Sequence, residues 1–298
     1  MRTPSDLQQA ISFFEQAVAL DSTYALGYAG LAQTYVVIGS NALAQPDSVY
    51  PLAERYCRKA LSLDADLAEA HATLAGIQRE YYWDFAGSEA AFRKAIQLNP
   101  SYATAYQWLA EGYVQTRRYD LAEQQIKIAL SLDPHSPIIK HIQGQIYLAQ
   151  RMYDETIALQ KQILAENPNS QVSRMQLVYA YMGKQDYDNA LAENEKLSSE
   201  VNKISNRARI SAKQGDLTKA RIELQTLLEM SETGFVFPST IAVVYGDLGE
   251  VDEAFRWFDR ALEVRDPVLL LLNLYPPGQS VLDDPRYPAL LRKVGVIE

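Results

Sequence analysis

Apolar and polar residues follow one another along this chain in an order that returns with nearly the same letters. The segment ALSLDP at residues 129–134 has counterparts in AVALDS from residue 17, ALSLDA from residue 60, AIQLNP from residue 95, ILAENP from residue 163 and, in altered form, ALEVRD from residue 261. A pattern that recurs in this way predicts one structural unit used several times, rather than a fold built around a single centre.

The recurrence has a fixed period. Pro100, Pro134 and Pro168 are 34 residues apart, and each closes a copy of the segment. A second series keeps the same period and is followed each time by an aspartate: Tyr119 with Asp120, Tyr153 with Asp154, and Tyr187 with Asp188. Two independent series with one period predict units of 34 residues.

The recurring residues are also signals for the ends of helices. Proline cannot continue a helix, and its ring disfavours the helical conformation at the residue before it, so Pro134 predicts a helix that ends near Asp133. The aspartate after each recurrent tyrosine is expected to cap the helix that follows, with a contribution of ~1 kcal/mol. Each 34-residue period therefore contains a signal that ends one helix and a signal that begins the next.

The clearest unit spans residues 102–134. Its first half carries Tyr106, Leu109, Ala110 and Tyr113, and its second half carries Ala122, Ile126, Ala129 and Pro134. In this spacing and length the unit resembles a tetratricopeptide repeat. The resemblance implies an all-α fold, a right-handed α-solenoid of stacked antiparallel helix pairs, with small residues such as Ala110 where two helices approach closely.

The repeats divide the chain into three regions. Residues 1–22 are expected to hold half a repeat, with a second helix only, and residues 23–267 to hold seven repeat units, which are degenerate at 170–233. Residues 268–298 change character and are expected to form a C-terminal capping segment, because a terminal repeat would otherwise expose its stacking face.

A wider resemblance concerns the order of the pieces. The segments RTPSDLQQAISFFEQAVALDSTYALGYAGLAQTY, YYWDFAGSEAAFRKAIQLNPSYATAYQWLA and DDPRYPALLRKVGV occur in this order. The chain is similar in this respect to the C-terminal repeat region of bacterial multidomain signalling proteins, in which a winged-helix regulator, a nucleotide cyclase or a Ser/Thr kinase precedes a TolB-like segment. The resemblance implies a separated piece of a longer protein; a half repeat serving as an N-terminal cap is the alternative.

Composition and charge limit the classes of partner and compartment. The chain is 48% hydrophobic and 22% charged, which predicts a folded protein, and its net charge of −9 disfavours binding to nucleic acid. No apolar run is long enough for a membrane helix, and the first residues lack a secretory core. We expect a cytoplasmic chain, or a periplasmic one if it belongs to a longer membrane-anchored protein. The single cysteine, Cys57, excludes an internal disulfide.

Motifs of catalysis and of metal or cofactor binding are missing from the sequence. The three histidines, His71, His135 and His141, form no metal-ligand pattern, and no phosphate loop, dinucleotide turn or nucleophile elbow occurs. We therefore expect no enzyme activity, no metal and no cofactor.

The expected function is instead that of a scaffold for protein interactions. In tetratricopeptide proteins, positions two, five and nine of each first helix, with position six nearby, line a concave groove that takes a partner peptide or helix. The matching residues here are Gln107, Trp108, Glu111, His141, Gln145, Met175, Gln176 and Tyr179. They differ from the Lys, Asn and Arg clamp of the repeats that bind chaperone tails, so that function is not transferred.

Trp108 is the leading candidate for an interface anchor, since buried tryptophans commonly dominate interfaces. Packing between adjacent repeats is the alternative role for its ring. A second function remains open beside the scaffold: that of a regulatory or sensory C-terminal region of a bacterial signalling enzyme or transcription regulator whose front domain is absent from this chain.

Overall fold

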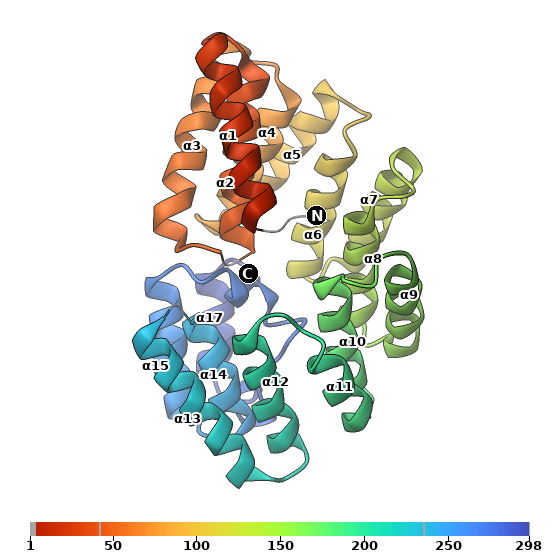
Figure 1. Ribbon diagram of the computed structural model, residues 1–298, viewed down its shortest axis with the longest axis vertical. Helices are drawn as coiled ribbons and strands as arrows, with labels where there is room; N and C mark the ends of the chain where they lie inside the picture. The colour runs from red at the N-terminus through yellow and green to blue at the C-terminus, as the bar shows by residue number, and fades with distance from the viewer. Residues whose placement is uncertain (1–3, 42, 235, 298) are drawn as a thin grey trace. The chain divides into compact units, whose positions relative to one another are not determined.

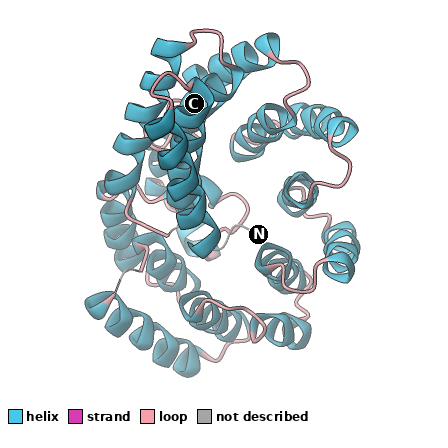
Figure 2. Cartoon of the chain, turned by 45° about the horizontal axis from the view of Figure 1, so that its top comes forward, coloured by secondary structure: helices cyan, strands magenta, loops and turns pink. Residues whose placement is uncertain are grey.

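Helices account for the regular structure of the chain. The computed structural model describes residues 4–41, 43–234 and 236–297, and within these ranges there are helices, turns and loops but no strand (Figure 2). The predicted all-α class is confirmed. No helix in the described ranges has both the length and the apolarity needed to cross a bilayer.

The helices follow one another through short connections (Figure 1). The first nine are α1 (Pro4–Leu20), α2 (Ala25–Ser40), α3 (Pro46–Leu63), α4 (Ala68–Glu80), α5 (Phe85–Leu98), α6 (Ala103–Gln115), α7 (Tyr119–Leu132), α8 (Pro137–Ala149) and α9 (Tyr153–Glu166). The others are α10 (Gln171–Gly183), α11 (Tyr187–Asn194), α12 (Glu200–Lys213), α13 (Leu217–Thr233), α14 (Pro238–Asp247), α15 (Val251–Glu263), the 3-10 helix η1 (Pro267–Leu271), α16 (Gln279–Leu282) and α17 (Arg286–Lys293).

The chain forms two compact units. Unit 1 comprises Met1–Gly112 with Gln124–Pro134, and unit 2 comprises Tyr113–Glu123 with His135–Glu298. In unit 1, α2 packs on α3 and α4 on α5, and the first helices α2 and α4 also contact each other. In unit 2 the corresponding pairs are α8 with α9, α10 with α11, α12 with α13 and α14 with α15.

The recurring segment ends α3, α5 and α7 in the same way. Its alanine is fully buried at Ala60, Ala95 and Ala129, where a larger side chain would hold neighbouring backbones apart. The cap residue that follows leaves the helical conformation, as Asp64 and Asn99 show, and its backbone N–H still donates to the alanine carbonyl. The segment recurs because each of these helices needs a small residue where helices pack closely and a residue that ends the helix.

The expected capping role of the aspartates after the recurrent tyrosines is wrong. Asp120, Asp154 and Asp188 lie in the first turns of α7, α9 and α11, because the helices already begin at the tyrosines. The residue before the tyrosine is the N-cap, and Asp186 fills that place by accepting the backbone N–H of Asn189 at 3.3 Å. The first-turn aspartates still favour the helix through its dipole.

The turn between the two helices of a pair places one residue in the left-handed region. Later pairs use glycine there, at Gly215 (φ 85°) and Gly249 (φ 79°). Earlier pairs hold larger residues in the same conformation: Trp83 (φ 57°), Arg117 (φ 59°), Arg151 (φ 61°) and Gln185 (φ 60°). A side chain makes this conformation unfavourable, so these turns carry strain that a glycine would remove.

The C-terminal residues are anchored to the last helix pair of unit 2. Leu269, Leu270 and Leu272 are buried, and η1 and α16 both pack against α14. The buried carboxylate of Asp266 accepts the backbone N–H groups of Ser239 and Val268, each at 2.9 Å, and thereby joins the starts of α14 and η1. Burial raises the pKa of Asp266 to about 6.

Candidate functional site

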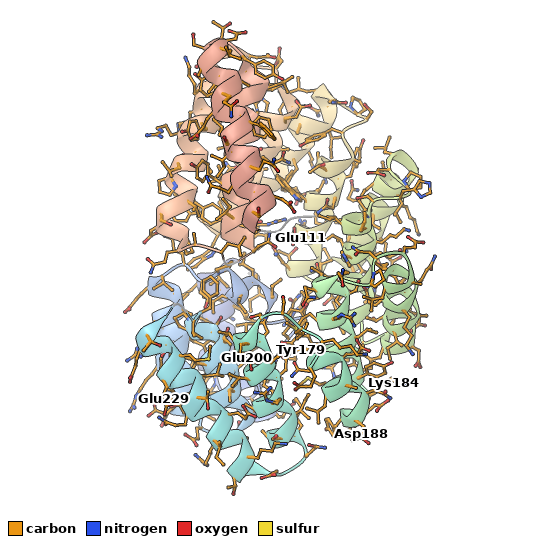
Figure 3. All side chains as sticks on the ribbon, in the orientation of Figure 1. Glu111, Tyr179, Lys184, Asp188, Glu200 and Glu229 are labelled. Carbon is orange, nitrogen blue, oxygen red and sulfur yellow. The ribbon has the colours of Figure 1, made fainter. Side chains whose placement is uncertain are left out.

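The eight predicted partner-binding residues all lie on first helices. Glu111 is on α6 and Tyr179 on α10 (Figure 3). They fall into two groups, because Gln107, Trp108 and Glu111 belong to unit 1 and the other five to unit 2. His141, Gln145, Met175 and Gln176 complete the second group, on α8 and α10.

In unit 1, Trp108 is packed inside the protein. Its side chain is 5% exposed and its ring meets the edge of Phe92, with centroids 6.2 Å apart. Gly76 on α4 faces the indole ring, and a Cβ there would stand 3.6 Å from it, at ordinary van der Waals distance. Gln107 is buried as well. The partner-binding role of these two residues stays a prediction.

A buried arginine links the first helices of unit 1. Arg79 on α4 donates to the carbonyl of Trp108 at 2.7 Å and to the carboxylate of Glu111 at 3.0 Å, both on α6. The same guanidinium also donates to Glu80 at 2.6 Å, and Glu80 in turn accepts the hydroxyl of Tyr50 at 2.7 Å. Two carboxylates thus compensate the buried cation, and Glu111 is committed to holding α4 against α6.

In unit 2, His141 and Gln176 are part of a buried polar cluster. The Gln176 amide donates to the His141 carbonyl at 3.1 Å and accepts from the Gln160 amide at 2.8 Å, which joins α8, α9 and α10. Gly144 leaves the space for this pair, because a Cβ there would stand 2.1 Å from the Gln160 nitrogen. Burial lowers the pKa of His141 to about 4, so its ring is neutral at pH 7.

The remaining residues of this group are partly exposed. Met175 and Tyr179 share one face of α10 with Val172, which is 47% exposed and occupies the second position of that helix. Val172 is not among the residues predicted from the sequence, although it stands at the second position of its first helix. Gln145 lies on α8 with a similar degree of exposure.

The C-terminal segment of unit 2 covers part of this first-helix face. Tyr275 stacks on Tyr179 with ring centroids 4.0 Å apart. Asn273 donates to the carbonyl of Val114 at 2.8 Å, at the end of α6. The carbonyl of Pro276 accepts from Arg209 at 2.6 Å. The segment is therefore held by side chains and carbonyls of several first helices.

A second buried arginine joins two first helices of unit 2, α12 and α14. Arg209 on α12 donates to the Asp247 carboxylate on α14 at 2.6 Å, and both side chains are nearly inaccessible. Lys213 approaches the same carboxylate at 3.2 Å. The arrangement parallels Arg79 and Glu111 in unit 1, where an arginine also joins two successive first helices.

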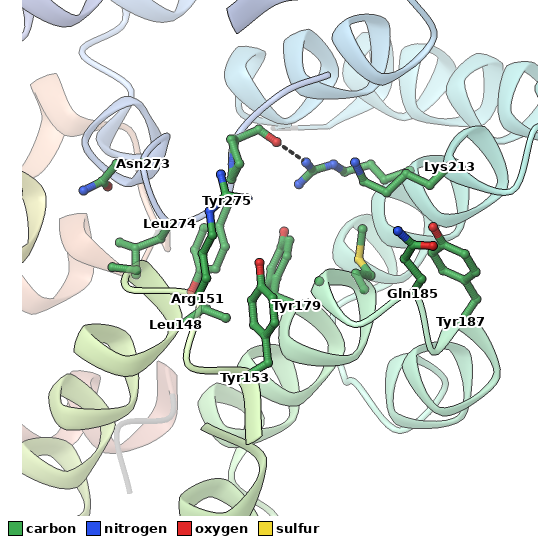
Figure 4. A pocket seen from close by; sticks show the side chains of 15 residues that line it. Leu148, Arg151, Tyr153, Tyr179, Gln185, Tyr187, Lys213, Asn273, Leu274 and Tyr275 are labelled. Atoms are coloured by element: carbon green, nitrogen blue, oxygen red, sulfur yellow. Dashed lines mark hydrogen bonds between the residues drawn. The ribbon is translucent and has the colours of Figure 1, made fainter. Parts of the chain in front are cut away.

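A pocket of about 350 Å³ opens beside these contacts (Figure 4). It lies within unit 2, and its lining comes from the ends of α8 and α10, the starts of α9 and α11, from α12 and from the C-terminal segment. Sequence reasoning missed it, because residues 273–276 are far in the chain from the helices that they complete. Within the described ranges, no group of three or more potential metal ligands is close enough to hold an ion.

Comparison with known proteins identifies the repeat. A tetratricopeptide repeat family model matches residues 84–137 and 109–171. No match was found among curated protein sequences.

Several solved structures share the fold. A tetratricopeptide repeat protein from Parabacteroides merdae has a TM-score of 0.58 at 16% identity, covering 82% of this chain and 93% of that one. The human IFIT1 dimer with m7Gppp-AAAA has a TM-score of 0.68 at 18% identity, covering 89% of this chain and 69% of that one.

Yeast Tom70 has a TM-score of 0.53 at 15% identity; 97% of this chain is covered, but only 62% of Tom70. At such identities the likenesses establish the fold alone. Together with the 34-residue period and the paired helices, they show an α-solenoid fold of the tetratricopeptide repeat type, whose repeats the family model matches over residues 84–171.

Proposed function

We propose that this chain is a non-enzymatic scaffold that binds a partner peptide or helix in a groove lined by its first helices. The observation that carries the proposal is the row formed by Val172, Met175 and Tyr179 on α10. The three residues are spaced so that they share one helix face, and Val172 is 47% exposed. Partly exposed apolar residues on a first helix suit the docking of an amphipathic partner.

Buried ion pairs between first helices, one in each unit, support the proposal. Arg79 with Glu111 in unit 1, and Arg209 with Asp247 in unit 2, hold successive first helices together through buried ion pairs. A surface that is already ordered loses less conformational entropy when a partner binds. Rigid first helices therefore suit recognition by a preformed groove.

The predicted residues then divide into two roles. We assign partner contact to the partly exposed Gln145, Met175 and Tyr179, whereas Glu111, also partly exposed, holds α4 against α6 through Arg79. Gln107, Trp108, His141 and Gln176 are buried and support the helices that carry them. A net charge of −9 favours a protein partner over a nucleic acid.

A pair of matched substitutions tests the proposal. Val172→Lys places a charge on the first-helix face, whereas Leu217→Lys places one on the second helix α13 at a site of similar exposure, 44% against 47%. Quantitative affinity capture from an extract of the source cells is the measurement, with helicity and melting temperature as folding controls. We expect Val172→Lys to deplete specific partners and Leu217→Lys to retain them. Equal retention by the two variants would contradict the assignment.

A second function has an observation of its own. Phe13 and Leu20 on α1 are 60% and 91% exposed, which leaves apolar surface for another element to cover. This supports the regulatory or sensory region of a bacterial signalling enzyme or transcription regulator as the alternative. The intact mass of the native polypeptide, captured with an antibody, distinguishes the two: a mass near 33.5 kDa favours the free scaffold, and a much larger one the regulatory region.

A further inference from the structure

The pocket in unit 2 has the size of a site for a small molecule. Its volume of about 350 Å³ falls in the range typical of small-ligand clefts. The walls are formed by helix ends, two turns and the C-terminal segment, and Asn273 and Arg209 fix that segment through its neighbours on the first helices. The cavity is therefore bounded by parts of unit 2 that are hydrogen-bonded in place.

The charges around the pocket are predominantly positive. Arg151, Arg209 and Lys213 line it, and none of the other lining residues is acidic. Asp247 neutralises only one positive charge, since Arg209 and Lys213 both donate to it. In the described part of the chain Arg151 has no ion-pair partner. The pocket is thus a cationic site in a protein whose net charge is −9.

The acidic residues next to the lining residues in sequence do not change this balance. Asp154 pairs with Lys184, and Asp186 is the N-cap of α11. Asp188 lies in the first turn of α11, on the exposed surface. None of the three lines the pocket.

Aromatic rings form much of the remaining wall. Four tyrosines line the pocket: Tyr153, Tyr179, Tyr187 and Tyr275. The hydroxyl groups of Tyr153 and Tyr179 point in the same direction (Figure 4). Gly183 lets the Tyr153 ring lie against α10, because a Cβ there would stand 2.3 Å from the ring. Flat rings and phenolic hydroxyls suit a ligand that is planar and bears polar atoms at its edge.

Two of the strained turn residues lie at this pocket. Arg151 (φ 61°) and Gln185 (φ 60°) both line it and hold the left-handed conformation that Gly215 and Gly249 adopt without strain in later pairs. Strained backbone of this kind is often found at functional sites. At these two turns the chain carries a guanidinium and an amide, groups that a glycine would not supply to the pocket.

We propose that this pocket binds a small organic anion, a flat ring that carries a carboxylate or a phosphate. The ring lies among the tyrosines, and the anionic group accepts hydrogen bonds from the lining cations Arg151 and Lys213. A guanidinium matches the oxygens of either anion in two-pronged geometry. The site goes beyond the proposed scaffold function and does not depend on it.

Isothermal titration of the full chain with benzoate and with phenyl phosphate tests the site, and benzyl alcohol is the uncharged control. We expect saturable binding of one anion per chain, which weakens as salt is added. The anion that binds more tightly identifies the charged group. Equally tight binding of benzyl alcohol, or no saturable binding of either anion, overturns the proposal.

Two matched variants locate the site. Arg151→Gln removes the charge but keeps a residue type that the equivalent turn already holds, at Gln185 with φ 60°. Arg117→Gln makes the same change at the turn of the preceding pair, outside the pocket lining. We expect Arg151→Gln to weaken binding roughly tenfold and Arg117→Gln to leave it unchanged. Equal effects of the two variants overturn the assignment, with circular dichroism melting as the folding control.

Discussion

The ring of Tyr275 stacks on the ring of Tyr179, with centroids 4.0 Å apart and planes inclined by 27°. Tyr179 belongs to a first helix in the middle of the chain, whereas Tyr275 lies in the segment after the last repeat. The stack therefore ties the C-terminal segment to the first-helix face of unit 2. The segment does more than cover the end of the last helix pair.

Replacement of Tyr275 measures how much this contact stabilises unit 2. Tyr275→Ala removes a half-buried ring, and we expect the free energy of unfolding to fall by about 2 kcal/mol, less than for a fully buried aromatic residue. Tyr275→Phe keeps the ring stack, and we expect it to change the free energy of unfolding by less than about 0.5 kcal/mol. Urea unfolding gives both values. A Tyr275→Ala variant as stable as the parent would show that the stack contributes nothing.

The Arg209–Asp247 pair is expected to be far more sensitive than an exposed one. Asp247→Asn leaves the Arg209 guanidinium, whose side chain is 2% exposed, without its carboxylate, and should cost about 3–5 kcal/mol. Asp154→Asn breaks the pair with Lys184, in which Asp154 is 80% exposed, and should cost less than about 1 kcal/mol. Thermal unfolding of the two variants side by side makes the comparison. Similar losses would mean that the inter-helix pair is not important for stability.

Two glycines inside first helices should respond in opposite directions to alanine. Gly144→Ala forces a Cβ to within 2.1 Å of the Gln160 amide and disrupts a buried hydrogen bond, so we expect a loss of about 1–3 kcal/mol. Gly112→Ala meets its nearest atom at 3.6 Å and should stabilise its helix by up to about 1 kcal/mol. Urea titration of each variant provides the test, and a stabilising Gly144→Ala would exclude the close packing described for Gln160 and Gln176.

Acid should weaken the fold through His141. Its pKa is lowered from 6.5 to about 4 in the folded protein because burial disfavours the charged ring. The folded state thus binds fewer protons than the unfolded state between these values. The stability that His141 contributes is fully present above pH 6.5 and is lost as the pH falls toward 4. The total loss is about 3 kcal/mol. His141→Gln should remove this part of the pH dependence.

The pH dependence of stability that Asp266 contributes has the opposite sign, so it must be separated from that of His141. Its pKa is raised from 3.8 to about 6, so its contribution is present below pH 3.8 and is lost as the pH rises through 6. The difference in unfolding free energy between the parent and His141→Gln, measured from pH 7.5 to 4.5, isolates the histidine. We expect the parent to lose stability relative to the variant as the pH falls. A constant difference would mean that His141 is not buried as a neutral ring.

The period made the fold predictable from the sequence. Prolines and tyrosines 34 residues apart mark helix ends, and these signals are local to a few residues. The N-caps were misplaced by two residues, because Asp186 and Asp188 both stand near the start of α11 and only the structure shows which one accepts a backbone N–H.

The site was less predictable because it depends on contacts between distant residues. The burial of Trp108 follows from its packing against Phe92 and Gly76, and the pairing of Arg209 with Asp247 follows from the packing of α12 on α14. The pocket requires residues 273–276 to return to α10, which no repeat position indicates. Val172, by contrast, stands at a repeat position and was within reach of the sequence.

Site-specific photo-crosslinking tests the scaffold proposal most directly. A photoreactive phenylalanine analogue replaces Val172 on the first helix α10 in one bait and Ile222 on the second helix α13 in the other, at sites 47% and 65% exposed. Irradiation in an extract of the source cells, followed by mass spectrometry, identifies what each position touches. We predict that Val172 crosslinks to a defined peptide segment of one partner and that Ile222 does not. A defined crosslink from Ile222 alone would contradict binding along the first helices.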